Sequence, residues 1–332
     1  MLKNINVSVS PHIRTKDTTT SIMRDVCIAL LFPLAAGVYT FGVRALVIIL
    51  ISVLSCVLSE FLFQKILKQP TTVNDLSAVV TGLILAVNLP STVPFWIPVL
   101  GGVFAIIIVK QLFGGIGQNF MNPALAARCF LLISFASIMT DFPTKVNYLF
   151  GTPSTVTDAV SSATPMGLVK AGTVTGWFDM LVNTHSGSIG EASAIAVLIG
   201  AAYMVVRKVI DIKIPLIYIV STIGIISFIQ LVSGNGDILT VDYLVLQICG
   251  GGLLVGAFFM ATDYVTSPIT PKGKIIYALI LGLMTALIRT ISPSSEGVSY
   301  SIIIGNMLTP LIEKYTVPKA FGVKGGKKAR KI

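Results

Sequence analysis

The stretch "TGLILAVNLPSTVP", residues 81–94, is an apolar run that is too short to cross a bilayer and that ends at prolines. Counted from residue 76, the run allows about 14 helical residues, or about 21 Å at 1.5 Å per residue, whereas a crossing needs roughly 20 residues. Broken helices inside a membrane are tolerated where they line a cavity or are buried in protein. The stretch therefore predicts a helix that stops within the membrane.

A second interrupted segment lies further along the chain. The run "NPALAARCFLLISF" (122–135) follows directly on the glycine-rich "FGGIGQNFM" (113–121). Both features recur in the same order in the second half, as "VGAFFMATDYVTSPITP" (255–271) and "SIIIGNMLTPLI" (301–312). In this alignment Gly82 pairs with Gly256, the prolines at 90 and 94 with those at 268 and 271, and Asn119 or Asn122 with Asn306.

The order of these features indicates a duplicated unit of five helices. Because five is an odd number, the two copies must enter the membrane in opposite orientations. Inverted repeats with discontinuous helices point to a ligand or ion site at the interface between the repeats. The alternative interpretation is that Gly and Pro are simply frequent in membrane helices.

The composition supports a membrane protein. Of the 332 residues, 54% are hydrophobic and 11% are charged, with a mean hydropathy of +0.88, which leaves too little polar surface for an ordinary globular domain. We predict an all-α polytopic membrane protein. Its transmembrane segments, about ten by apolar length, lie near residues 25–43, 45–64, 76–89, 94–113, 122–139, 191–206, 214–233, 243–261, 275–289 and 298–315.

The charges predict the orientation. There are 24 Lys and Arg residues against 14 Asp and Glu, and the basic clusters lie between apolar runs, as membrane topology requires. This distribution argues against a nucleic-acid partner. With both termini in the cytoplasm, 19 of the 24 basic residues lie on the inner side. The sequence therefore predicts a multi-pass membrane protein with both termini in the cytoplasm and residues 140–190 outside it.

The resulting division of the chain has five parts. They are a cytoplasmic segment at 1–24, a first repeat at 25–139, an extracytoplasmic loop at 140–190, a second repeat at 191–315 and a basic cytoplasmic tail at 316–332.

The four cysteines all lie in apolar segments and there are only two histidines. We therefore expect no metal, haem or iron–sulfur site from this chain, and any redox chemistry would require an organic cofactor or a partner.

The longest polar interval contains "DAVSSATPMG", residues 158–167. Proline holds the residue before it extended, so Pro165 presents the hydroxyl of Thr164. The small neighbours Ser161, Ser162 and Ala163 leave that hydroxyl accessible, and Asp158 is close enough in sequence to organise a cation or the loop. These features are typical of a modification site, and an ordinary polar turn is the alternative.

A family resemblance favours modification. The pattern formed by Asp158, Ser161, Ala163 and Thr164 resembles the flavinylation motif of membrane redox complexes, with Ser162 at a position that is often glycine. Together with "GGIGQNFMNPALAA" (114–127), "HSGSIGEASA" (185–194) and "ATDYVTSPIT" (261–270), it resembles the D subunits of Rnf ion-translocating electron-transport complexes over nearly the whole chain. The chain is similar, more distantly, to the B subunit of the sodium-pumping NADH:quinone oxidoreductase.

The resemblance implies a redox subunit that does not complete a reaction alone. A flavin transferase would esterify Thr164 with FMN, and Asp158, Ser161, Ser162 and Ala163 would form the recognition segment. The complex would exchange electrons between ferredoxin and NAD and couple this to sodium or proton transport. Its other membrane and peripheral subunits would be the partners of this chain, together with the lipid bilayer of a bacterial inner membrane.

The resemblance also implies a second, noncovalent flavin, riboflavin. The repeat interface is the place where we expect it. The candidate lining residues cluster at the helix breaks and are Gly114, Gly115, Asn119, Asn122, Asp263 and Asn306. Helix capping or close packing would explain each of them equally well.

Three charged residues in or beside apolar segments need a separate explanation. Arg128 lies inside a short segment, where it either faces a cavity or partner or extends to the membrane surface. Asp75 and Glu191 each precede a Ser-Ala pair at an expected helix start, which favours a position at a helix N-terminus over ion handling.

Two other functions remain open from the sequence. A channel or secondary transporter can also use inverted repeats with broken helices, and fold alone does not separate it from a redox subunit. A scaffold that only holds partner subunits is a third interpretation. Thr164 distinguishes them, because only the redox subunit requires a covalent flavin there.

Overall fold

The computed structural model describes residues 18–142, 181, 187–234, 240–291 and 297–318. Within these ranges the protein is helical and has no strand. Thr164 and the other flavinylation-motif residues, Asp158, Ser161, Ser162 and Ala163, lie outside the described residues. The extracytoplasmic loop and the division into five parts therefore stay predictions.

The first half contains six α-helices and three shorter elements among its described residues. In chain order these are α1 (Thr19–Phe41), α2 (Val43–Ile66), the 3₁₀ turn η1 (Val73–Asp75), α3 (Ser77–Val87), α4 (Trp96–Val103), the π-helix η2 (Phe104–Lys110), the 3₁₀ turn η3 (Gln111–Phe113), α5 (Pro123–Ser134) and α6 (Ala136–Met139).

The described part of the second half follows a similar order. It contains the 3₁₀ turn η4 (Ile189–Glu191), α9 (Ala194–Val206), α10 (Lys213–Val232), α11 (Val241–Cys249), α12 (Leu253–Val255), the π-helix η6 (Gly256–Met260), α13 (Pro271–Ile291) and α14 (Val298–Thr316). Every apolar segment found in the sequence is thus largely helical. Among the described residues, five helices are long and apolar enough to cross a membrane, or six if α11 and the helix from Leu253 to Met260, bent by 52°, form one span.

The helix α3, which contains most of the opening stretch, is short and almost completely buried. Ten of its 11 residues are buried, as expected for a helix that is apolar on all sides. It ends at Asn88 and is followed by the prolines of the opening stretch. It packs on α1, α2 and α5, so it ends inside the protein, and its end within a membrane stays a prediction.

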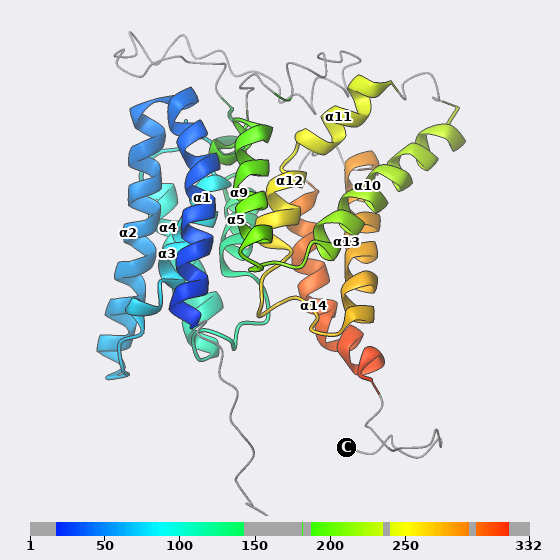
Figure 1. The fold of residues 1–332 in the computed structure, drawn as a ribbon. Coiled ribbons are helices and arrows are strands. Elements are labelled where there is room, and N and C mark those ends of the chain that lie inside the picture. Colours follow the sequence, from blue (N-terminus) through cyan, green and yellow to red (C-terminus); the bar gives the residue numbers. More distant parts are fainter. Residues whose placement is uncertain (1–17, 143–180, 182–186, 235–239, 292–296, 319–332) are drawn as a thin grey trace, which may run out of the picture.

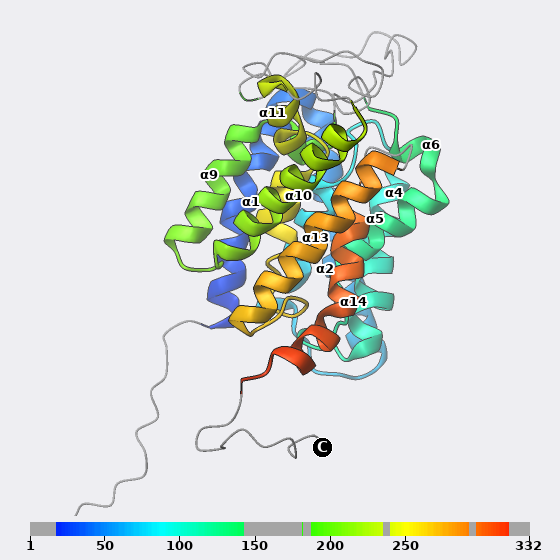
Figure 2. The same cartoon turned by 90° about the vertical axis from the view of Figure 1, so that its right-hand side faces the viewer.

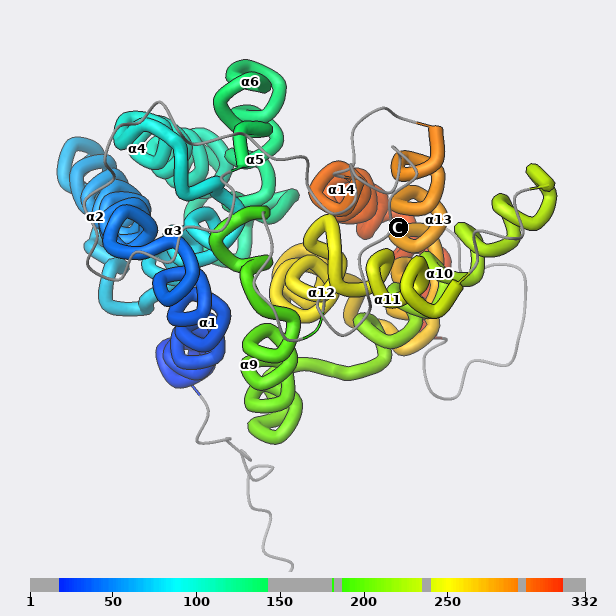
Figure 3. The backbone as a smooth tube through the Cα atoms, turned by 90° about the horizontal axis from the view of Figure 1, so that it is seen from above, coloured from blue at the N-terminus to red at the C-terminus, as the bar shows by residue number. Residues whose placement is uncertain are grey.

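The two halves meet along α1 and α9 and along α5 and α14. Seen from above, α12 lies near the middle, with α1 to α6 on one side and α10 and α13 on the other (Figure 3). The first helix begins and the last helix ends at the same end of the bundle (Figure 1). The helices α6 and α11 lie towards the opposite end (Figure 2). The chain therefore starts and finishes its helical part on one side.

Small residues bring α10 and α13 into close contact. Gly282 of α13 faces Ser221 of α10, and a Cβ at Gly282 would collide with the Ser221 side chain and lie 3.0 Å from the backbone nitrogen of Thr222. Such close approach at small residues is typical of membrane helix pairs. The absence of a side chain at Gly282 and the small side chain of Ser221 therefore allow the two helices to approach closely.

We expect Gly282→Ala to destabilise the protein by about 1–3 kcal/mol, because the added methyl group overpacks the contact between α10 and α13. The measurement is thermal unfolding of the purified protein in detergent. Gly224→Ala on α10 is the matched control, since no atom lies within 4 Å of a Cβ at that position. Equal unfolding temperatures for the two variants would contradict the packing described here.

Candidate functional site

A cavity lies between the two halves of the protein. Its volume is about 90 Å³, which is smaller than the roughly 300–1,000 Å³ of typical ligand pockets. Its wall comes from α1, α3, η2 and the segment before α5 on one side, and from α9, η6 and the segment after η6 on the other. Most of its lining is apolar, and its polar lining side chains are those of Ser77, Thr81, Lys110, Asn119, Asn122, Thr262, Asp263 and Tyr264.

Three of the candidate residues from the sequence meet in this wall. They are Asn119 and Asn122 from the first half and Asp263 from the second. The Asn119 amide nitrogen donates to the Met121 carbonyl at 3.0 Å. The Asn122 side-chain oxygen caps α5 by accepting from the next backbone N–H groups, at 3.1 and 3.3 Å, which is the usual task of an N-cap asparagine.

Asp263 is a half-buried acid in the segment between η6 and α13. Burial raises the pKa of its carboxyl above the ordinary value, and hydrogen bonds from Thr266 and the following backbone N–H groups only partly oppose this. The Thr266 hydroxyl donates to Asp263 Oδ2 at 3.1 Å, and the Val265 N–H donates to Oδ1 at 3.4 Å. The acid is therefore held in place at the cavity wall.

The other three candidates, Gly114, Gly115 and Asn306, do not line the cavity. Asn306 sits behind Asn122: with its amide oriented to suit its neighbours, it accepts from the Asn122 N–H at 3.2 Å and donates to the Tyr277 hydroxyl at 2.8 Å. Gly114 and Gly115 have φ angles of 112° and 94° and form the turn after η3. They shape the segment that carries Asn119.

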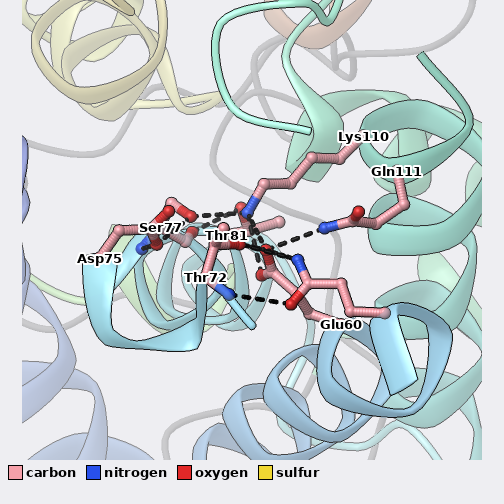
Figure 4. A network of polar contacts seen from close by, with 8 residues as sticks. Glu60, Thr72, Asp75, Ser77, Thr81, Lys110 and Gln111 are labelled. Carbon is pink, nitrogen blue, oxygen red and sulfur yellow. Dashed lines mark hydrogen bonds and ion pairs between the residues drawn. The ribbon is translucent and has the colours of Figure 1, made fainter. Parts of the chain in front are cut away.

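Lys110 and Glu60 form a buried ion pair (Figure 4), and Lys110 lines the cavity. The Lys110 ammonium, at the end of η2, donates to Glu60 Oε2 at 2.9 Å, to Glu60 Oε1 at 3.1 Å and to the Ser77 hydroxyl at 2.6 Å. The side chains of Lys110 and Glu60 are only 4% and 0% exposed. Lys110 and Ser77 also line the cavity, whereas Glu60 does not.

Further polar side chains enclose this ion pair. Glu60 Oε1 also accepts from Gln111, Thr72 and Gln64 at 2.8, 3.1 and 3.3 Å. The Ser77 hydroxyl and backbone N–H both donate to Asp75 Oδ1, at 2.5 and 2.8 Å. Asp75 therefore accepts hydrogen bonds at the start of α3, as its position in the sequence indicated.

Glu60 and Lys110 are not among the residues that the sequence singled out. Each is a charged residue within or at the end of an apolar span, and such residues are functional candidates by default. That signal was available, but Lys110 also fits a basic residue at the cytoplasmic surface. The π-helical turn that ends at Lys110 is not visible in the sequence, although such turns are frequent at functional sites.

Arg128 faces the protein interior. Its Nη1 donates to Asn88 Oδ1, and the Asn88 amide lies 3.8 Å from the sulfur of Met260 in the second half. Arg128 is 4% exposed. It therefore links the end of α3 to α5 near the junction of the two halves and does not extend to the membrane surface.

A third buried cation, Arg289, holds the break between α11 and α12. Its guanidinium donates to the Gln247 carbonyl at 2.7 Å, to the Gln247 side chain at 3.0 Å and to the carbonyls of Gly250 and Gly251 at 3.0 and 3.2 Å. The last carbonyls of a helix have no intrahelical partner, and Arg289 supplies hydrogen-bond donors to those at the end of α11. Gly251 has a φ of 62°, a conformation that favours glycine.

Glu191 lies at the same break. It ends η4 ahead of α9, and a Cβ added to Gly252 would lie 2.7 Å from Glu191 Oε1. Its carboxylate also interacts electrostatically with Arg289. The two residues thus support the discontinuous helix, and whether Glu191 also handles ions stays a prediction.

Comparison with known proteins identifies relatives along the whole chain. The model of the NQR2, RnfD, RnfE family matches residues 6–322. The D subunit of the Na(+)-translocating ferredoxin:NAD(+) oxidoreductase complex of Acetobacterium woodii is 47% identical, over 99% of this chain and 98% of the relative. The D subunit of the proton-translocating ferredoxin:NAD(+) oxidoreductase complex of Clostridium ljungdahlii is 39% identical, over 97% and 98%.

A third relative extends the comparison beyond these two. The D subunit of the ion-translocating oxidoreductase complex of Shewanella piezotolerans is 32% identical, over 96% of this chain and 98% of its own. All three matches are nearly complete in both directions, and the family match covers both halves of the protein. The chain therefore belongs to the NQR2, RnfD, RnfE family.

Proposed function

We propose that this chain is the flavin-bearing membrane subunit of an Rnf-type complex and relays electrons through FMN esterified to Thr164. The observation that carries the proposal is the motif formed by Asp158, Ser161, Ala163 and Thr164, within a chain 47% identical to the D subunit of a ferredoxin:NAD(+) oxidoreductase complex. When bound, the flavin supplies electron transfer, while the protein supplies its position and environment.

The role of Thr164 is to provide the hydroxyl oxygen of a permanent phosphoester. A flavin that could dissociate would be lost from a site outside the cytoplasm, so covalent attachment is the arrangement that such a site requires. A flavin transferase is needed for maturation, and the remaining subunits supply the donor and acceptor. The chain from its own membranes, run on a denaturing gel, should show flavin fluorescence at its own position.

We further propose that the two halves are inverted repeats of five segments each, with both termini in the cytoplasm. The packing supports this. In each half a serine of the second helix faces a glycine of the fourth segment. In the first half Ser55 of α2 faces Gly102 of α4, and in the second half Ser221 of α10 faces Gly282 of α13. The pairs α1 with α9 and α5 with α14 are then contacts between equivalent helices.

Two of the buried cations, Lys110 and Arg289, fit the same symmetry. Lys110 follows Gly102 by eight residues and Arg289 follows Gly282 by seven, and the π-helical turn of η2 accounts for the extra residue. Lys110 lies beside the start of α3, and Arg289 lies beside the start of α12. Each half therefore places a cation at a helix break.

We propose the cavity as the site of a second, noncovalent flavin of the riboflavin type. The chemistry of the lining supports this proposal, whereas the cavity, at about 90 Å³, would have to widen to admit the ring. Met23, Ile84, Phe258 and Phe259 supply apolar surface, and the amides of Asn119 and Asn122 together with Asp263 supply polar groups. A few convergent polar groups in an otherwise apolar pocket are typical of cofactor sites.

We expect Val26→Trp to lower the riboflavin content of the purified protein at least tenfold, because Val26 lines the cavity and the indole would fill it. The measurement is the flavin released from the protein by acid, quantified by fluorescence. Val220→Trp is the control, since Val220 lies on α10 with 60% of its surface exposed. If the two variants retain the same riboflavin, the flavin binds elsewhere.

A transporter without redox function is the alternative proposal. The broken helix at Gly250 to Gly252 and the buried cations favour it, because transporter sites use such breaks. The two proposals differ at Thr164. A transporter would carry no flavin at that residue, and its transport would be unaffected by the loss of the hydroxyl.

A further inference from the structure

The helices α1 and α9, one from each half, lie side by side and form a seam (Figure 3). Gly200 of α9 sits directly on α1, because a Cβ at that position would collide with the Ala29 carbonyl. Near the start of α1 and the end of α9, Arg207 pairs with Asp25 at 2.9 Å. The seam therefore ends in an ion pair, at the end of the bundle where the helical part of the chain starts and finishes (Figure 1).

Basic side chains outnumber acidic ones at this end of the seam. The Asp25 carboxylate accepts from Arg207 at 2.9 and 3.2 Å and from the Tyr203 hydroxyl at 3.2 Å, which holds it inside the seam at 7% exposure. Arg24 precedes Asp25 and Lys208 follows Arg207, and both are exposed. We call Arg24, Asp25, Arg207 and Lys208 the seam cluster, and its three cations and one acid give a net charge of +2.

Lys208 has a left-handed backbone conformation, with a φ of 56°. Its N–H donates to the Val205 carbonyl at 3.0 Å, and the Val209 N–H donates to the Met204 carbonyl at 2.9 Å. A residue in this conformation commonly closes a helix, and glycine is the residue that adopts it at the lowest cost. The chain therefore carries a cation where glycine would fold more easily, which favours a functional reason for the charge.

Exposed apolar side chains continue from the seam cluster along both helices. Val206, directly before Arg207, is 79% exposed, and Ile199, two turns earlier on the same side of α9, is 49% exposed. On α1, Phe32 lies two turns beyond Asp25 and is 39% exposed. An exposed apolar surface that ends in cations matches a phospholipid, whose acyl chains are apolar and whose phosphate is anionic.

We propose that the seam cluster binds the headgroup phosphate of an anionic phospholipid, whose acyl chains lie along α1 and α9. Basic sites between membrane helices on the cytoplasmic side recognise such headgroups, and the proposed orientation places this end of the bundle on that side. Arg24 and Lys208 attract the phosphate, while Arg207 stays paired with Asp25. A lipid bound here contacts both halves of the protein and stabilises their contact.

The test removes the two exposed cations and leaves the ion pair intact. In the double variant Arg24→Gln with Lys208→Gly, glycine suits the left-handed backbone, so the folded chain loses charge without gaining strain. The control is the double variant Lys65→Gln with Lys68→Gly. Lys68 closes α2 in the same way, with a φ of 53°, and both lysines are exposed at the end of a single helix, away from the seam.

The measurement is the unfolding temperature of the full-length chain in detergent, titrated with anionic phosphatidylglycerol, with zwitterionic phosphatidylethanolamine and with inorganic phosphate. A ligand that binds only the folded state raises this temperature as its concentration increases. We expect phosphatidylglycerol alone to stabilise the wild-type chain. The seam variant should bind it about thirtyfold more weakly, because each basic side chain near an anionic headgroup contributes about fivefold, and the control variant should bind it as the wild type does.

Three results would overturn the proposal. An equal loss of affinity in the control variant would show unspecific attraction between a basic surface and an anionic micelle. Equal stabilisation by inorganic phosphate would identify a soluble anion as the ligand, and a wild-type chain that phosphatidylglycerol does not stabilise would have no such site. If the double variant does not accumulate, Lys208→Gly alone decides the question, with an expected loss of about fivefold. None of these results depends on a flavin, so they leave the proposed electron relay untouched.

Discussion

Thr164→Ala is expected to abolish the covalent flavin completely, because the phosphoester needs the hydroxyl oxygen and alanine has none. The chain should lose its fluorescence on a denaturing gel, and electron transfer by the assembled complex should fall to background. The complex should still assemble, because the substitution removes one oxygen from a side chain that the sequence places in a polar loop. This separates a redox role from a scaffold, which would keep normal electron transfer.

Two variants serve as controls for this experiment. Thr157→Ala removes a hydroxyl from the same segment, one residue before the motif, and should leave the flavin in place. Thr164→Ser retains a hydroxyl and should restore part of the modification. A flavin that persists in Thr164→Ala would show that another residue carries it.

The second large effect is expected at the buried ion pair. Lys110→Met leaves the Glu60 carboxylate buried without its cation, and breaking a buried pair in this way costs about 3–5 kcal/mol. The double variant with Glu60→Gln should recover most of this loss, because it contains no unpaired charge. Thermal unfolding in detergent and the amount of protein in the membrane are the measurements.

A surface ion pair provides the control. Lys274 lies 3.1 Å from Asp211, with the two side chains 25% and 32% exposed, so Lys274→Met should cost only about 0–1 kcal/mol. If Lys110→Met is as mild as Lys274→Met, the pair in the bundle is hydrated and the description of the network is wrong.

Much of the helical framework was predictable because apolar length is a local property of the sequence. The short buried helix α3 followed from the proline-terminated stretch at 81–94, and each apolar segment proved largely helical. The exact breaks were not predictable. The π-helical turns η2 and η6 and the bend between α11 and α12 depend on tertiary packing, which overrides local preference.

The candidate site was predictable only in part. Asn119, Asn122 and Asp263 meet in one cavity because the glycine and proline breaks that mark them lie at the contact of the two halves. Gly114, Gly115 and Asn306 shape or support that wall. Lys110 and Glu60 were missed because hydropathy patterns do not reveal which charges point inwards, and pairing across 50 residues is a property of the fold.

The central claim, that Thr164 carries a covalent redox cofactor, is tested most directly by the intact mass of the chain isolated from its own membranes. We predict one added FMN, attached as a phosphoester, and proteolytic fragments should locate the increment at Thr164. An unmodified residue 164 in that material would contradict the account.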